Sequence, residues 1–278
     1  MERVPFSPAR LRPIAGNTLR EAVRQKALHA LLLLAAMLIA GAHGFRDFHF
    51  GSPELKFVAD LGLGVMALFG AVVAVAVTTQ LFFSEFEHRT AQTLLARPVW
   101  RAEFILGKFL GAAVITGAFC GLLTGVLALV LWSREASLLR EFPDAWASGR
   151  MINFGHLAAA GLLQWLKLLV LSALTLLVAS YARTPLFTLV SGLVIFAICQ
   201  LQHLAVVASA REGDSVGGLL AGVVVRMFPN FHYFDLGEGP GGGSPLTWSL
   251  IARVAGYAIT YAVSSCALAV YSFRCREI

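Results

Sequence analysis

The sequence predicts an all-α membrane protein with six transmembrane helices. Its 278 residues are 58% hydrophobic and only 14% charged, with a mean hydropathy of +0.74, whereas soluble domains average about 25% charged residues. Apolar runs of about 20 residues, the length that crosses a bilayer, recur along the whole chain. The polar stretches between them are too short for a separate soluble domain. We therefore expect a single transmembrane domain over residues 1–278.

The first expected span, residues 27–43, follows a basic and proline-rich lead-in. Thr18 and Glu21 have the spacing of a capping box, so a helix can start there. The first turns of this helix are basic and its body is apolar, which is typical of a helix that rises from the membrane interface. A cleaved signal peptide is the alternative, but 26 residues before the apolar core is long for its basic region.

The other five spans are separated by short polar segments. They are expected at 58–83, 104–132, 161–181, 185–207 and 248–273. Thr184 and Pro185 suit the N-cap and first position of the fifth span. Between the last two spans, the apolar stretch 216–228 is too short to cross a membrane, so we expect it to be re-entrant or interfacial.

The distribution of Lys and Arg predicts the orientation of these spans. With the N-terminus inside, 13 basic residues face the cytoplasm and 8 face outward, while acidic residues show the opposite bias. The positive-inside rule then places both termini in the cytoplasm of a multi-pass protein of the cytoplasmic membrane. The net charge of +6 reflects this distribution. No basic patch interleaved with aromatics lies outside the spans, which excludes nucleic-acid binding.

Glycines at four-residue spacing in the third span predict close helix packing. They form two rows on neighbouring faces of the helix: Gly107, Gly111, Gly117, Gly121 and Gly125. Packing inside the bundle and packing between two subunits are both consistent with these rows.

Lys167 is the one basic residue clearly within a span, and it lies close to Gln164. A charge inside the membrane is by default a candidate functional site. With the fourth span starting at 161, however, Lys167 lies one or two turns from the outer surface, where its side chain can snorkel to the interface. We interpret it first as a snorkelling residue, then as part of a substrate path, and last as a member of a structural pair.

No motif for catalysis or for metal or cofactor binding is found. The four cysteines lack CxxC and Cys/His spacings, and the seven histidines include no HExxH. Gly107-Lys108 is followed by Phe and lacks the upstream glycine of a P-loop, so it binds no ATP in that manner. A haem site needs two facing axial ligands, and the scattered histidines offer little for it. We expect no catalytic residue, metal ligand or cofactor on this chain.

The densest charge cluster lies between the second and third spans, in FFSEFEHRTAQTLLARPVWRAEFILGKFLG (82–111). Glu85 and Arg89 have the helix-stabilising order and spacing, and Pro98 ends the helix because the residue before a proline is disfavoured in it. The pattern predicts a short cytoplasmic helix over 85–96 across the ends of the two spans. An ordinary basic loop is the alternative, but such a loop requires neither the carboxylates nor Leu94 and Leu95. A docking surface for a soluble partner requires both.

This segment resembles the one between the second and third spans of ABC-2 type transporter permeases, where an acidic residue is followed by RT, LL, a basic residue with proline, and GK. The matching positions are Glu85, Arg89, Thr90, Leu94, Leu95, Arg97, Pro98, Val99, Arg101, Gly107, Lys108 and Gly111. The N-terminal NTLREAVRQKALHALLLLA is similar to the entry helix of that family. The resemblance covers nearly the full chain.

The resemblance implies a permease subunit of an exporter that pairs with a second permease, as a homodimer or a related heterodimer, and with separate ATPase subunits that hold ATP and Mg. It implies an elbow helix at about 17–26, a coupling helix within the loop 85–103, and an outer-leaflet re-entrant segment before the sixth span. The docking residues are then Glu85, Glu87, Arg89, Thr90, Leu94, Leu95, Arg97, Pro98 and Arg101. The alternatives are a non-transporting membrane anchor for a cytoplasmic partner and an integral membrane enzyme or haem protein.

Overall fold

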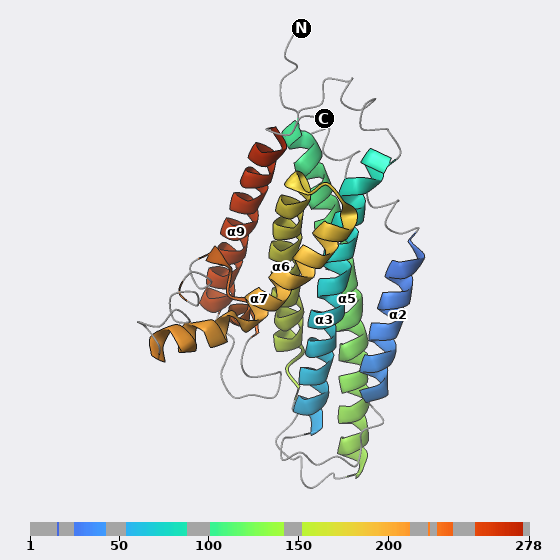
Figure 1. Cartoon of the computed structure of the whole chain (residues 1–278). Helices are drawn as coiled ribbons and strands as arrows, with labels where there is room; N and C mark the ends of the chain where they lie inside the picture. Colours follow the sequence, from blue (N-terminus) through green and yellow to red (C-terminus); the bar gives the residue numbers. More distant parts are fainter. Residues whose placement is uncertain are drawn as a thin grey trace.

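The computed structural model describes residues 16, 25–42, 54–87, 101–141, 152–211, 222, 227–235 and 248–274, and within them all regular secondary structure is helical. Figure 1 shows the helices packed side by side as a bundle. In chain order the elements are α2 (Lys26–Gly41), α3 (Glu54–Glu87), α5 (Arg101–Glu141), α6 (Phe154–Tyr181), α7 (Pro185–Arg211), the 3-10 helix η4 (Phe231–Phe234) and α9 (Trp248–Arg274).

Five of the described helices are long and apolar enough to cross a membrane. Their apolar parts are Leu55–Ser84, Ala102–Leu138, Phe154–Tyr181, Pro185–Leu204 and Trp248–Phe273. These match the second to sixth predicted spans. The first predicted span coincides with α2, which has 16 residues and is shorter than the roughly 20 that cross a hydrocarbon core. A sixth span is therefore not confirmed.

The predicted start of the fourth span was wrong by about two turns. α6 begins at Phe154 and not at 161, because Asn153 caps it. The side-chain oxygen of Asn153 accepts hydrogen bonds from the backbone N–H groups of Gly155 and His156, at 3.0 and 3.4 Å. Such a cap satisfies donors that the first turn leaves unpaired. α5 likewise continues beyond its predicted end into a polar extension.

α6 is the central helix of the bundle. It contacts α3, α5, α7, α9 and η4, and Figure 1 shows it between α9 on one side and α3 and α5 on the other. Its small hydroxyl side chains, Ser172, Thr175 and Ser180, are satisfied within the helix. The hydroxyls of Ser172 and Thr175 donate to the carbonyls of Leu168 and Leu171, both at 2.9 Å. Internal pairing of this kind suits an environment that offers no water.

Four glycines allow neighbouring helices to approach closely. A Cβ added at any of them would collide with a side chain from another helix. The pairs are Gly62 with Leu127, Gly70 with Leu168, Gly161 with Thr124, and Gly192 with Val75.

The glycine rows predicted in α5 differ in their surroundings. A Cβ at Gly117 would lie 3.0 Å from Nε1 of Trp165 on α6, whereas Gly121 and Gly125 face open space within this chain. Packing inside the bundle thus accounts for the first of these three positions. The two glycines nearer the start of α5 are buried: Gly107 and Gly111.

Candidate functional site

The predicted coupling segment falls largely outside the described residues. Glu87 ends α3 and Arg101 begins α5, and the structure describes neither residues 88–100 nor the side chains at these two edges. Residues 17–24 of the predicted elbow helix and most of 216–228 also lie outside it. The docking roles stay predictions for Glu85, Glu87, Arg89, Thr90, Leu94, Leu95, Arg97, Pro98 and Arg101.

Phenylalanine rings hold together the end of the bundle at which α3 ends and α5 begins, here called the junction end. The ring of Phe82 packs edge-on against those of Phe83, Phe104 and Phe273, with centroids 5.3, 6.1 and 5.9 Å away. Phe104 of α5 stacks on Phe273 of α9 at 5.9 Å. Leu176 of α6 belongs to the same buried cluster. Four helices therefore meet at the junction end through apolar contacts.

Two charged residues are buried beside these rings on the first turns of α5. Glu103 and Lys108 are 0% and 2% exposed. The ammonium nitrogen of Lys108 lies 5.8 Å from the ring centroid of Phe104, within the range of a cation–π contact. The lysine of the GK motif is therefore part of the packing at the junction end.

An ion pair formed by a buried lysine and a partly exposed aspartate lies at the middle of α6. Lys167 Nζ donates to Asp235 Oδ1 at 2.9 Å, and the lysine is 0% exposed. Lys167 comes thirteen residues after Phe154 and fourteen before Tyr181, about 20 Å from either end of the helix at 1.5 Å per residue. The expectation that it snorkels is wrong, because the earlier start of α6 moves it from near the surface to the centre of the span.

Asp235 belongs to residues 227–235, here called the inserted segment, which contain η4. Asn230 caps η4 by accepting a hydrogen bond from the backbone N–H of His232 at 2.9 Å. The backbone N–H of Asn230 donates in turn to the hydroxyl of Tyr257 on α9, also at 2.9 Å. Together with the contacts of η4 to α6 and α7, these bonds attach the inserted segment to three helices.

Helix α7 holds the inserted segment from the other side. Gln200 Nε2 donates to Asp235 Oδ2 at 3.3 Å, and Gln202 Nε2 donates to the carbonyl of Phe228 at 2.7 Å. The Asp235 carboxylate therefore accepts one hydrogen bond on each oxygen, from α6 and from α7.

Two further polar atoms on α6 and α7 lack partners within the described part of the chain. Gln164 lies one turn before Lys167, which puts both on the same face of α6. Its Nε2 is buried without a hydrogen-bond partner there, and so is Oε1 of Gln200. Lys167 Nζ also lies 5.8 Å from the ring centroid of Phe231. We call Gln164, Lys167, Gln200 and Asp235 the central polar site.

The sequence pointed to Gln164 and Lys167 as a possible polar site, and it did not place Gln200 or Asp235 beside them. Asp235 lies 68 positions from Lys167 in the chain, and the stacking of His203 on His232 at 5.1 Å was also not foreseen. One signal in the sequence could have identified Asp235. It is an acidic residue that follows an aromatic stretch in a segment too short to span the membrane, and such a residue is a candidate partner for an intramembrane lysine.

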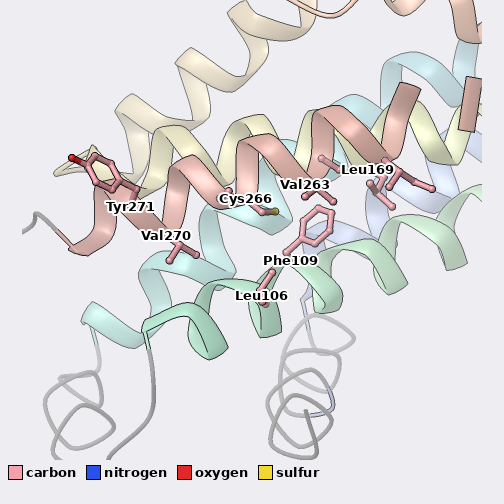
Figure 2. A pocket seen from close by; sticks show the side chains of 10 residues that line it. Leu106, Phe109, Leu169, Val263, Cys266, Val270 and Tyr271 are labelled. Carbon is pink, nitrogen blue, oxygen red and sulfur yellow. The ribbon is translucent and has the colours of Figure 1, made fainter. Parts of the chain in front are cut away.

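An apolar groove of about 540 Å³ runs between α5, α6 and α9. Figure 2 shows Leu106 and Phe109 of α5 facing Val263 and Cys266 of α9 across it. Leu169 of α6 also lines it. The groove is lined by apolar side chains apart from a tyrosine ring, as suits contact with hydrocarbon.

A family model described as ABC-2 family transporter protein matches residues 12–233, which is most of the chain. The chain belongs to the ABC-2 transporter family. It is therefore a multi-pass permease component of an ABC transporter. A comparison with curated proteins found no match.

In this ABC-2 permease the central polar site is the feature whose burial costs free energy. The cost of removing two charges from water is offset only where their geometry is good and their remaining hydrogen-bonding groups are satisfied. Apolar residues of the same size can replace a buried pair at little or no loss of stability. Intramembrane charges of this kind usually mark a function, and the central polar site is therefore the candidate functional site.

Proposed function

We propose that this permease is the membrane subunit of an exporter in the cytoplasmic membrane, driven by a separate ATPase that docks on the loop 85–103. ATP and Mg bind to that partner, and this chain supplies no ATP site. A second permease, identical or related, completes the transporter. Both termini and the docking loop face the cytoplasm, and the segment before α9 enters the bundle from the outer leaflet.

The observation that carries this proposal is the phenylalanine packing at the junction end. Residues 88–100 connect α3 directly to α5, and the two helices meet there through Phe82 and Phe104. Phe273 of α9 packs on both rings, at 5.9 Å from each. Because closely packed interiors transmit displacement and do not absorb it, a force on the docking loop moves α3, α5 and α9 together.

Such coupling needs a partner that distinguishes two conformations of the bundle. A ligand or partner shifts an equilibrium only by its difference in affinity for the two states. We propose that the ATPase with bound ATP favours the state in which the junction end is displaced. The displacement then changes how α9 and the inserted segment lie on α6.

The test uses the permease co-expressed with an ATPase and reconstituted in vesicles. Leu94→Asp places a charge on the predicted docking face, and Glu85→Lys with Arg89→Glu reverses its charge pattern. We expect both variants to lose most transport and most stimulation of ATP hydrolysis. Arg140→Glu, at the opposite end of α5 where the side chain is exposed, is the matched control and should keep both activities.

Two outcomes would contradict the proposal. One is normal transport by the Leu94→Asp variant, which would show that the loop is not the docking surface. The other is an ATPase that co-purifies with the permease while neither moves any cargo. That result would favour the non-transporting membrane anchor.

A further inference from the structure

We propose that the central polar site binds the anionic head group, a carboxylate or a phosphate, of an amphiphilic cargo. Lys167, Gln164 and Gln200 are the binding groups. Asp235 of the inserted segment occupies their site in the present conformation and stands in for the cargo. The inference rests on the proposed function, because it names the class of substrate that the same bundle exports.

The first argument is the chemistry of the groups that converge on Asp235. An ammonium and an amide approach its two oxygens, at 2.9 Å from Lys167 and 3.3 Å from Gln200. The buried Nε2 of Gln164, one turn from Lys167, is a donor without a partner among the described residues. Donors that come from two helices and surround a pair of oxygens are the arrangement that recognises a carboxylate or phosphate.

The second argument is charge balance in the transport cycle. Lys167 is completely buried at the middle of α6, and an uncompensated charge there is strongly unfavourable. Asp235 balances it only while the inserted segment lies against α6. Any conformation in which that segment withdraws needs another anion beside Lys167, and the head group of a cargo supplies one.

The third argument is the difference in exposure between the two partners. The Lys167 side chain is 0% exposed and fixed on the central helix, whereas the Asp235 side chain is 37% exposed. Asp235 also lies just beyond the single turn of η4 and not within a long helix. The carboxylate is therefore the partner that can leave, and its open side is where a competing head group can enter.

The surroundings of the site indicate the rest of the ligand. The ring of Phe231 lies 6.3 Å from that of Phe196 on α7 and 6.1 Å from that of Phe234. Phe231 and Phe234 are both buried. Because the walls beside the polar site are aromatic and apolar, a ligand with an anionic head and a hydrocarbon body fits better than a fully polar anion.

The experiment measures binding to the permease alone in an uncharged detergent. The probes are dodecyl phosphate and dodecanoate, with dodecanol and dodecyltrimethylammonium as uncharged and cationic controls. Asp235→Asn removes the internal anion and leaves Lys167 in place. We expect this variant to bind one or both anionic probes at least about tenfold more tightly than the wild type, and its unfolding temperature to rise with probe concentration.

Two charge-balanced variants keep the test decisive if Asp235→Asn does not fold. Lys167→Gln with Asp235→Asn should lose the preference for anionic over uncharged probes. Lys167→Asp with Asp235→Lys should transfer the preference to the cationic probe. Lys56→Gln, on the first turn of α3, is the matched control and should bind the probes as the wild type does.

The comparison of dodecyl phosphate with dodecanoate identifies the head group. Equal binding of anionic probes by the wild type and by both charge-balanced variants would overturn the inference. An unchanged preference for anions in the swapped variant would overturn it as well. Since no ATPase is present, a failure of the proposed coupling leaves this result untouched, and absent probe binding with intact ATPase coupling rejects the inference alone.

Discussion

The junction end and the central polar site both attach α6 to its neighbours, and they do so with opposite chemistry. At the junction end the contacts are rings and aliphatic chains, with Phe82 and Phe273 almost completely buried. At the central polar site the contact is an ammonium and a carboxylate, with an amide from α7. The junction end is held together by apolar packing, and the central polar site is held together by charge.

The difference teaches which region can change state during transport. Apolar packing is non-directional and loses stability gradually as volume is removed. A buried ion pair behaves differently, because loss of one partner leaves the other uncompensated. The junction end is therefore suited to transmitting a displacement without breaking, and the central polar site is suited to having two distinct arrangements.

The largest effect is expected from Asp235→Asn, which leaves Lys167 buried without an anion. We expect a loss of about 3–5 kcal/mol in the free energy of unfolding, measured by denaturation in detergent. Lys167→Met should cost less, since the Asp235 side chain is 37% exposed and can be solvated. The double variant Lys167→Met with Asp235→Asn should recover most of the stability. A double variant as unstable as Asp235→Asn alone would contradict the assignment of the loss to charge.

The free energy of unfolding should decrease gradually as side-chain volume is removed from the junction end. Phe82→Ala removes a ring that is 0% exposed and that three other rings contact, so we expect a loss of about 3 kcal/mol. Phe82→Leu keeps most of the volume and should cost less than about 1.5 kcal/mol. The same denaturation assay measures both. Equal losses from the two variants would show that this region, too, depends on a specific geometry and not on volume.

The sequence predicted the apolar helices well because each long span is a local run of apolar residues. Such runs predicted α3, α5, α6, α7 and α9 directly. The prediction began this span at residue 161 because it did not consider Asn153, a good N-cap, from which α6 starts. That single error moved Lys167 toward the surface and led to the wrong expectation of snorkelling.

The central polar site could be predicted only in part, because its two halves are far apart in the chain. Gln164 and Lys167 lie on one helix, and their spacing puts them on the same face. Asp235 and Gln200 join them only through the packing of η4 between α6 and α7, which no local pattern specifies. The glycines showed the same limit: Gly192 meets Val75 of another helix without belonging to any regular row.

A smaller effect is expected where a glycine of α7 meets two other helices. A Cβ at Gly192 would lie 2.7 Å from Val75 Cγ1 and 3.2 Å from Thr175 Oγ1, so Gly192→Ala forces α7 away from α3 and α6. We expect a loss of about 2 kcal/mol in the denaturation assay. Gly121→Ala is the matched control. It faces open space and should be neutral, or stabilising by up to about 1 kcal/mol through helix propensity. A comparable loss from both variants would contradict the close approach at Gly192.

The smallest effect tests whether the two regions are independent. Tyr257→Phe removes the hydroxyl that accepts the Asn230 N–H and keeps the ring contacts with Tyr233 and Phe234, whose centroids are 5.9 and 6.2 Å away. We expect a loss of about 1 kcal/mol and faster hydrogen exchange confined to amides of the inserted segment. Tyr271→Phe, at a position 69% exposed, should change neither.

The position of the faster exchange decides the question. If the Tyr257→Phe variant also speeds exchange around Phe82 and Phe273, then α9 carries a disturbance at the inserted segment to the junction end within the resting protein. The two regions would then form one cooperative unit. Exchange confined to the inserted segment means that the two regions open independently in the resting protein. The proposed ATP-driven cycle requires that behaviour, because in it the partner ATPase, and not thermal opening of the segment, releases Asp235 from Lys167.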